Sequence, residues 1–153
     1  MKALNVRSAA GLAAMVMGAV FAVVVSARAA NAVWTPKQGS DERKIVLNAA
    51  RVPIEKDLGQ PIVFEIKSLR VSDEWAFVYG KPKRESGGEV DWRKSIYADD
   101  VKDDSFSRLA AVLLARDGQG WRVITYSVGF SDVVWQSWDE EFGAPAWLWP
   151  PLN

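Results

Sequence analysis

The absence of cysteine constrains this chain most, because it must fold without a disulfide and without a thiolate metal site. Histidine is absent as well, which removes the usual zinc sites, haem ligation and every catalytic dyad that uses an imidazole base. We therefore expect neither a metal ion nor a cofactor, and a hydrophobic core must hold the fold. Hydrophobic residues make up 49% and charged residues 25% of the 153 positions, a composition typical of globular domains.

The N-terminal segment has the pattern of a secretory signal peptide. Lys2 and Arg7 precede an uncharged, largely apolar stretch that runs from position 8 to position 27 and ends in small residues. The spacing of these small residues predicts cleavage after Ala29 or Ala32. An uncleaved anchor is the alternative, because the stretch approaches the ~20 residues that a membrane-spanning helix needs.

Cleavage would leave residues 33–153 as a single domain in the periplasm or outside the cell, with no stable membrane span after processing. Three of the 19 basic residues lie in the leader, so the mature domain has 16 basic and 19 acidic residues and a net charge of −3. It contains no basic run, which argues against nucleic acid or anionic lipid as its main partner. A cell-envelope component or a protein partner fits this location better.

The first helix signal follows Ser40, a good N-cap residue, with acidic residues in the first turn. Apolar residues then recur on one face up to Arg51. Pro53 predicts an interruption, followed by a further turn that ends at Gly59. We expect one kinked helix or two short ones.

Beyond Pro61 the hydrophobic period changes to that of a strand. The alternation switches parity near Ser68, which predicts a β-bulge there. A second strand over 75–79 completes an antiparallel hairpin. Residues 81–107 are polar and should be mostly loop, with a short strand over 90–97.

The C-terminal half predicts two long strands and a helix. Residues 107–116 and 121–128 are strand-like and flank a turn over 117–120. Ser131 or Asp132 should then cap a helix that ends at Gly143, and the apolar tail should dock on the body. The fold class is therefore α+β: an N-terminal helix on a curved antiparallel sheet of about four or five strands, plus a C-terminal helix and a docked tail.

This order of elements resembles the cystatin-like and nuclear-transport-factor-like folds. Several segments also resemble those of a set of small exported bacterial proteins, mostly uncharacterised, that have one α+β domain. The segments that carry this resemblance are 42–51, 53–55, 75–78, 121–123, Gly129, 132–135 and 143–145. They are packing motifs, so the resemblance implies a location and a fold and no functional residue.

No catalytic residue is predicted. The aspartates between positions 99 and 104 are interpreted as a solvated loop, and they lack the spacing of a calcium loop. An Asp base beside a Tyr donor is the one conceivable catalytic pair, and its available members are Asp132 and three tyrosines: Tyr79, Tyr97 and Tyr126.

The chain has eight tryptophans, and indole rings anchor both ligands and protein interfaces. Most of them should fill the core, but Trp92 and Tyr97 lie in the polar section and are candidates for an exposed contact. Arg93, beside Trp92, joins this set. Arg122 is a candidate for binding a ligand carboxylate, although a cross-strand ion pair with Glu65 or Glu74 is the simpler interpretation. Asp132 completes the candidate contacts.

These observations favour an exported, non-enzymatic binding or interaction protein of unknown ligand. One alternative is a small carboxylate-based isomerase or hydrolase with an Asp/Tyr pocket. The other is an inhibitor of an envelope enzyme, in which the segment 81–104 would project as a wedge.

Overall fold

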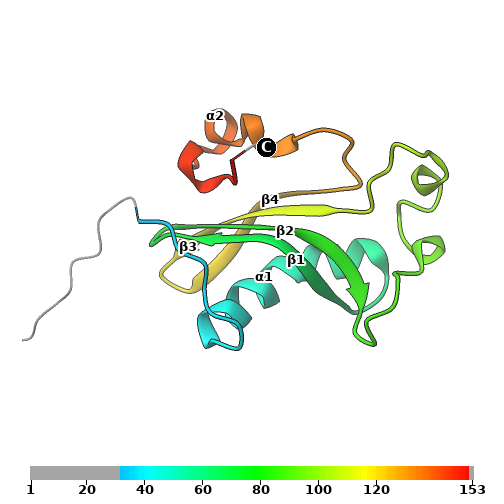
Figure 1. Cartoon of the computed structure of the whole chain (residues 1–153), viewed down its shortest axis with the longest axis horizontal. Helices are drawn as coiled ribbons and strands as arrows, with labels where there is room; N and C mark the ends of the chain where they lie inside the picture. Colours follow the sequence, from blue (N-terminus) through cyan, green and yellow to red (C-terminus); the bar gives the residue numbers. More distant parts are fainter. Residues whose placement is uncertain (1–31, 152–153) are drawn as a thin grey trace, which may run out of the picture.

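Four consecutive strands form one open antiparallel sheet in the computed structural model, which describes residues 32–151 (Figure 1). Each strand pairs with the next along the chain, in the order β1-β2-β3-β4. The principal elements are α1 (Asp41–Leu58), β1 (Ile62–Val71), β2 (Trp75–Arg84), β3 (Ala110–Asp117), β4 (Gly120–Val128) and α2 (Trp138–Phe142). The predicted α+β class is confirmed. Positions 1–31 of the predicted signal peptide lie outside the described residues.

Helix α1 begins and ends where the sequence signals predict, but it is not interrupted. The Ser40 hydroxyl accepts a hydrogen bond from the Arg43 N–H at 3.3 Å, and Gly59 closes the helix in the left-handed conformation. Pro53 lies inside the helix, where it costs about 3 kcal/mol. Ile54 and Leu58 beyond it are fully buried on the sheet, and burying two such side chains contributes about 3 to 6 kcal/mol. Their burial offsets the cost of the proline.

Strands β1 and β2 form the predicted hairpin with its bulge. The pairing shifts between Ile66 and Ser68, so that Lys67 is the extra residue on β1. Strand β2 is longer than the alternation indicated, because it continues past Tyr79 to Arg84. A bulge bends its strand and redirects the side chains beside it, which matters for the groove described below.

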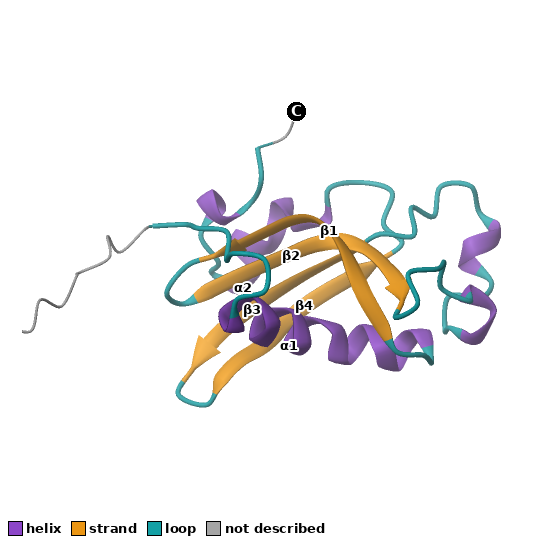
Figure 2. Cartoon of the chain, turned by 60° about the horizontal axis from the view of Figure 1, so that its bottom comes forward, coloured by secondary structure: helices purple, strands orange, loops and turns teal. Residues whose placement is uncertain are grey.

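The sheet is covered on both faces. Helix α1 packs across one face, where the core includes Val46, Val78 and Val112 (Figure 2). The segment from Val134 to Trp149 covers part of the other face, where Phe77 and Leu113 pack against it. This division explains the continuous apolar run of β3, whose side chains are buried on both sides.

Two predicted elements differ from the structure. Residues 90–97 form no strand: a short 3-10 helix spans Trp92–Lys94, and one isolated bridge precedes it, between Lys83 and Glu89. The last helix is divided into a 3-10 turn, Val134–Ser137, and the short α2, which ends at Gly143 in the left-handed conformation. The tail itself docks as expected, with Leu148 fully buried.

Candidate functional site

The largest hollow described for the molecule lies between the β1–β2 hairpin and the C-terminal segment. Its volume is about 610 Å³, and we call it the Tyr79 groove. Its polar and aromatic walls are Lys67, Ser68, Tyr79, Asp132, Trp135 and Gln136, and two prolines of the tail, Pro150 and Pro151, close one side. Ser68 lies directly opposite Tyr79 in the strand pairing, next to the bulged Lys67. The bulge therefore brings Lys67 and Ser68 to the groove together.

The aromatic wall of the groove is held in place by other rings. The ring centroids of Tyr79 and Trp135 are 4.9 Å apart. Trp135 also contacts Phe77 at 5.2 Å and Phe130 at 5.7 Å, both edge to face. Such contacts add to simple burial and fix ring orientation. The wall is thus ordered before any ligand arrives, which lowers the entropic cost of binding.

The polar groups around the groove are free to bind. Within residues 32–151, the Lys67 amine, the Ser68 hydroxyl, the Tyr79 phenol and the Gln136 amide make no hydrogen bond or ion pair. The Asp132 carboxylate accepts a hydrogen bond only from the adjacent Val133 N–H, at 2.7 Å. Asp132 therefore does not cap the following helix as predicted, and its charge remains available to the groove.

A smaller hollow of about 210 Å³ adjoins the first across the loop 131–133. The two share four wall residues: Tyr79, Asp132, Val133 and Trp135. The second hollow adds Ser107 and Phe130. Tyr79 and Asp132, two members of the predicted Asp/Tyr set, thus stand in the walls of both hollows.

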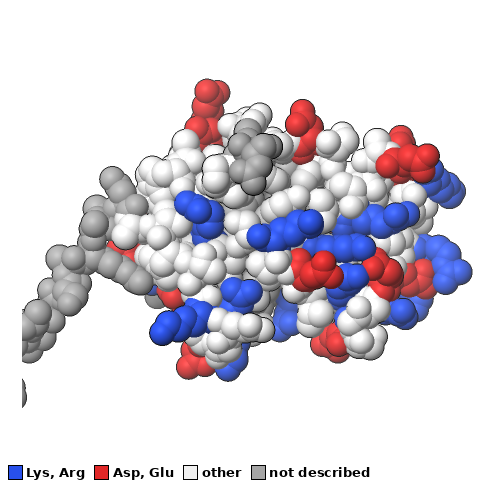
Figure 3. All heavy atoms as spheres, in the orientation of Figure 1, with Lys and Arg blue, Asp and Glu red and all other residues white. Residues whose placement is uncertain are grey.

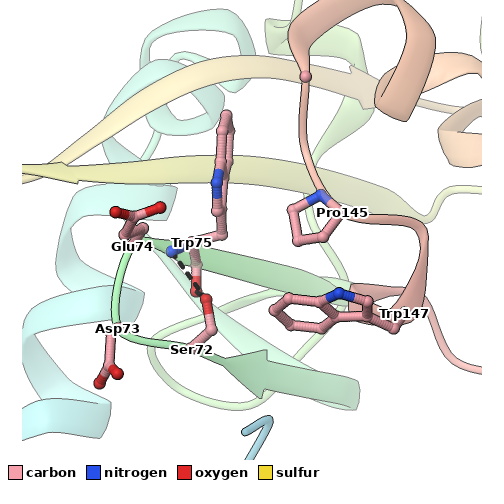
Figure 4. Close-up of a pocket in the computed structure, with 7 residues that line it drawn as sticks. Ser72, Asp73, Glu74, Trp75, Pro145 and Trp147 are labelled. Atoms are coloured by element: carbon pink, nitrogen blue, oxygen red, sulfur yellow. Dashed lines mark hydrogen bonds between the residues drawn. The ribbon is translucent and has the colours of Figure 1, made fainter. Parts of the chain in front are cut away.

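A different opening, of about 410 Å³, lies at the tip of the β1–β2 hairpin (Figure 4). The Trp75 and Trp147 indoles stand on opposite sides of it, while the carboxylates of Asp73 and Glu74 point away from Trp147. Buried Ser72 uses its hydroxyl within the turn, where it accepts from the Trp75 N–H at 3.0 Å. This opening thus offers indole surface but few polar groups aimed inward, so it is the weaker binding candidate.

A carboxylate with two tyrosines lies at the end of α1, away from these openings. Tyr97 and Tyr126 each donate a hydrogen bond to the same oxygen of Asp57, at 2.9 and 2.8 Å. Burial and then the Asp57 carboxylate raise the pKa of both phenols above the ordinary value. The backbone also joins here, because the Ile96 N–H donates to the Asp57 carbonyl at 2.9 Å.

This Asp57 cluster ties three parts of the chain together: the end of α1, strand β4 and the segment between β2 and β3. None of the hollows described above is lined by Asp57, and its Oδ2 already accepts two hydrogen bonds. The geometry favours a structural role. Sequence reasoning did not single out Asp57, because an aspartate in the last turn of an amphipathic helix carries no signal of a partner 40 or 69 residues away.

The predicted contact residues are not brought together. Trp92 is 8% exposed and packs against Phe106, so the expectation of an exposed indole is wrong: the 3-10 turn points its side chain into the helix-side core. Tyr97 is half-buried and bonded to Asp57. Arg93 is exposed and forms an ion pair with Asp91 at 2.9 Å.

Arg122 is also exposed, 3.7 Å from Asp117 rather than paired with Glu65 or Glu74. Of the five candidates, only Asp132 lines the Tyr79 groove. The polar groove residues that the sequence did not indicate are Lys67, Ser68 and Gln136. The bulge near Ser68 was the one available signal for the first two.

Charges on the visible surface are mixed. Basic and acidic side chains are interspersed on the face seen in Figure 3. On β2, Lys81 and Lys83 both donate to Glu89, and Lys83 also lies 3.7 Å from Glu65. The Glu89 hydrogen bond raises the pKa of Lys83, and the two lysines lower that of Glu89.

Residues 32–151 contain no group of three or more acidic, histidine or cysteine side chains arranged to hold a metal ion. No helix in this part of the chain has the length and hydropathy to cross a bilayer.

Comparison of the chain with models of protein families, with curated proteins and with solved structures returned no match.

Proposed function

We propose that this protein is an exported, non-enzymatic binding protein, periplasmic or secreted, whose ligand lies in the Tyr79 groove. One observation carries the proposal: a rigid aromatic wall borders a hollow of about 610 Å³ around which several polar side chains have no partner within the described chain. Small-molecule sites have this character, with volumes of about 300 to 1,000 Å³, apolar walls and a few orienting polar groups. The cystatin-like or nuclear-transport-factor-like form of the fold, suggested by the order of elements, belongs to this proposal.

The walls of the groove suggest the ligand class. The half-buried Tyr79 offers ring surface for stacking, the buried Trp135 behind it holds that ring in place, and the prolines add apolar contact. Lys67 and Asp132 bring one charge of each sign, so the groove favours a ligand that is neutral overall or carries both charges. We infer a small organic molecule with a ring-shaped body and hydrogen-bonding groups at its edge.

The Asp/Tyr enzyme is the second candidate, and its support is that Asp132 and Tyr79 line the same hollows. A general base in such an enzyme commonly has its pKa raised by burial. Asp132 is exposed, so the groove does not enclose its carboxylate in the apolar pocket that such a base commonly occupies. The exposure of Asp132 therefore favours a binding protein over an enzyme. The inhibitor alternative predicts a projecting wedge, whereas Trp92 and Tyr97 of that segment turn inward.

The test is a thermal-shift screen of residues 33–153 with ring compounds of graded charge: neutral sugars, phenols, indole derivatives, aromatic amino acids and amino sugars. A ligand at 100 times its Kd adds about 2.7 kcal/mol of stability. Trp fluorescence then reports titration, because Trp135 lies in the wall. We expect Tyr79→Leu and Asp132→Asn to weaken binding, and Asp73→Asn, at the other opening, to leave it unchanged.

Three results would contradict the proposal. A screen without any hit would remove the small-molecule site. A hit whose affinity is equal in Tyr79→Leu and wild type would place the ligand elsewhere. Conversion of the bound compound to product, lost in Asp132→Asn while binding persists, would replace the binding protein with the enzyme.

A further inference from the structure

The opening at the tip of the β1–β2 hairpin has walls that carry negative charge and no positive charge. Two of its lining residues, Asp73 and Glu74, are acidic and none is basic. Both side chains are exposed, and within residues 32–151 neither carboxylate makes a hydrogen bond or an ion pair. Arg70 donates to the Trp147 carbonyl at 3.1 Å but does not line the opening. The charge of the walls is therefore available to a ligand.

The same opening presents aromatic surface from two sides. Trp147 is 38% exposed and Trp75 is half-buried, so part of each indole is accessible. In Figure 4 the two rings stand on opposite sides of the opening, and one face of the Trp75 indole is turned toward Pro145. The backbone of Trp75 pairs with Ala115 of β3, and the fully buried Leu148 anchors the turn that carries Trp147. Both rings therefore stand on fixed segments, and the face of an indole attracts cations.

The scarcity of polar groups aimed inward decides which cation fits. The carboxylates of Asp73 and Glu74 point away from Trp147, and the Ser72 hydroxyl is used within its own turn. A primary ammonium or a guanidinium has N–H donors that need acceptors once they leave water, and the opening offers few. A quaternary ammonium has no N–H donor. Its methyl groups make apolar contact with the indoles, while the ring faces attract its charge.

We propose that this opening binds a quaternary ammonium cation, with the methylated head between the Trp75 and Trp147 indoles and with Asp73 and Glu74 balancing its charge at longer range. The volume of the opening, about 410 Å³, lies within the range of small-molecule sites. A negative group on the ligand would face the two carboxylates. The site therefore favours a cation such as choline over zwitterions such as glycine betaine and the phosphocholine headgroup of a lipid.

This site is separate from the Tyr79 groove, because the two hollows share no wall residue. Their charges differ as well. The groove has one basic and one acidic wall residue, Lys67 and Asp132, whereas the opening has two acidic ones. The inference consequently stands or falls independently of the ligand proposed for the groove.

The experiment is isothermal titration calorimetry of residues 33–153 at low salt, with choline and with its uncharged analogue, in which a quaternary carbon replaces the nitrogen. The two compounds have the same shape, so their difference in affinity isolates the charge. We expect choline to bind about 5- to 30-fold more tightly than the analogue. Glycine betaine and phosphocholine should bind more weakly than choline. Added salt should weaken the binding of choline more than that of the analogue.

Three variants locate the site. Trp147→Leu should lower the affinity for choline at least about fivefold, and Trp147→Phe, which keeps a ring, should retain most of it. The double variant Asp73→Asn with Glu74→Gln should lose most of the salt dependence. Trp121→Leu is the matched control, because it removes an indole that does not line the opening, and it should bind choline like the wild type. A cooperative thermal transition establishes that each variant is folded.

Four results would overturn the inference. The first is a wild-type chain that does not bind choline, and the second is an uncharged analogue that binds as tightly as choline. The third is an affinity for choline that is the same in folded Trp147→Leu as in the wild type. The fourth is an affinity that falls in Tyr79→Leu and not in Trp147→Leu, which would place the cation in the Tyr79 groove.

Discussion

Replacing Leu148 with alanine measures how firmly the C-terminal tail holds to the sheet. Leu148 is 0% exposed and belongs to the cluster that contains Phe77, Leu113 and Trp138. Truncation of a fully buried leucine costs the transfer energy of the lost methyl groups plus the energy of the cavity, about 2.7 to 5 kcal/mol. The site lies in a short turn near the chain end, where neighbours relax more easily, so we expect about 3 kcal/mol.

For a domain of this size, that loss lowers the midpoint of thermal unfolding by roughly 10 °C. Urea unfolding followed by Trp fluorescence gives the free energy directly, and Trp138 in the same cluster makes the signal sensitive. Val52→Ala is the control, because this valine is 64% exposed on the outer side of α1 and its truncation should change stability by less than about 0.5 kcal/mol. If Leu148→Ala costs less than about 1 kcal/mol, the tail is not packed as described, and a wall of the Tyr79 groove is lost with it.

Three more predictions concern other contacts. In a double-mutant cycle of Tyr97→Phe and Tyr126→Phe, each single change should cost about 1 to 2 kcal/mol by urea unfolding, and the two should be coupled, since they share one Asp57 oxygen. Both phenols have a raised pKa in the folded state, so their contribution to the free energy of unfolding is complete below about pH 10 and is lost as the pH rises further. Above this pH the free energy of unfolding of the wild type should therefore fall more steeply than that of the double Phe variant. Gly129→Ala should cost more than about 2 kcal/mol by the same assay, because Gly129 has a φ of 76° and an added Cβ would lie 1.8 Å from the Phe106 ring, and a cost below about 1 kcal/mol would contradict this packing.

Local sequence signals were sufficient for the features that are marked by a capping residue, a change of hydrophobic period or a turn. The acid-rich start after Ser40, the parity switch near Ser68 and the turn before Gly120 each predicted a feature that the structure contains. At Pro53 the prediction left one kinked helix or two short ones open, and the structure has one helix, because a propensity rule counts the cost of the proline and cannot count the burial of Ile54.

The candidate site depended on contacts between distant segments. Trp92 looked exposed because charged residues flank it, yet a single 3-10 turn buries it against Phe106. Asp57 accepts the hydrogen bond of Tyr97 only because the loop after β2 folds back to the end of α1. Lys67 and Gln136 line one groove because a bulge and a docked tail meet, and no sequence period encodes that meeting.

The meander of the sheet also sets the order in which a newly synthesised chain can bury its apolar surface. Each strand finds its partner in the segment just before it, so the sheet can assemble as synthesis proceeds. The face that bears Phe77 and Leu113 stays open until residues 134–149 have been made, because within the described part of the chain this segment covers it. A chain that has not yet reached this segment therefore displays an apolar surface that chaperones and proteases recognise, and docking of the segment ends that exposure.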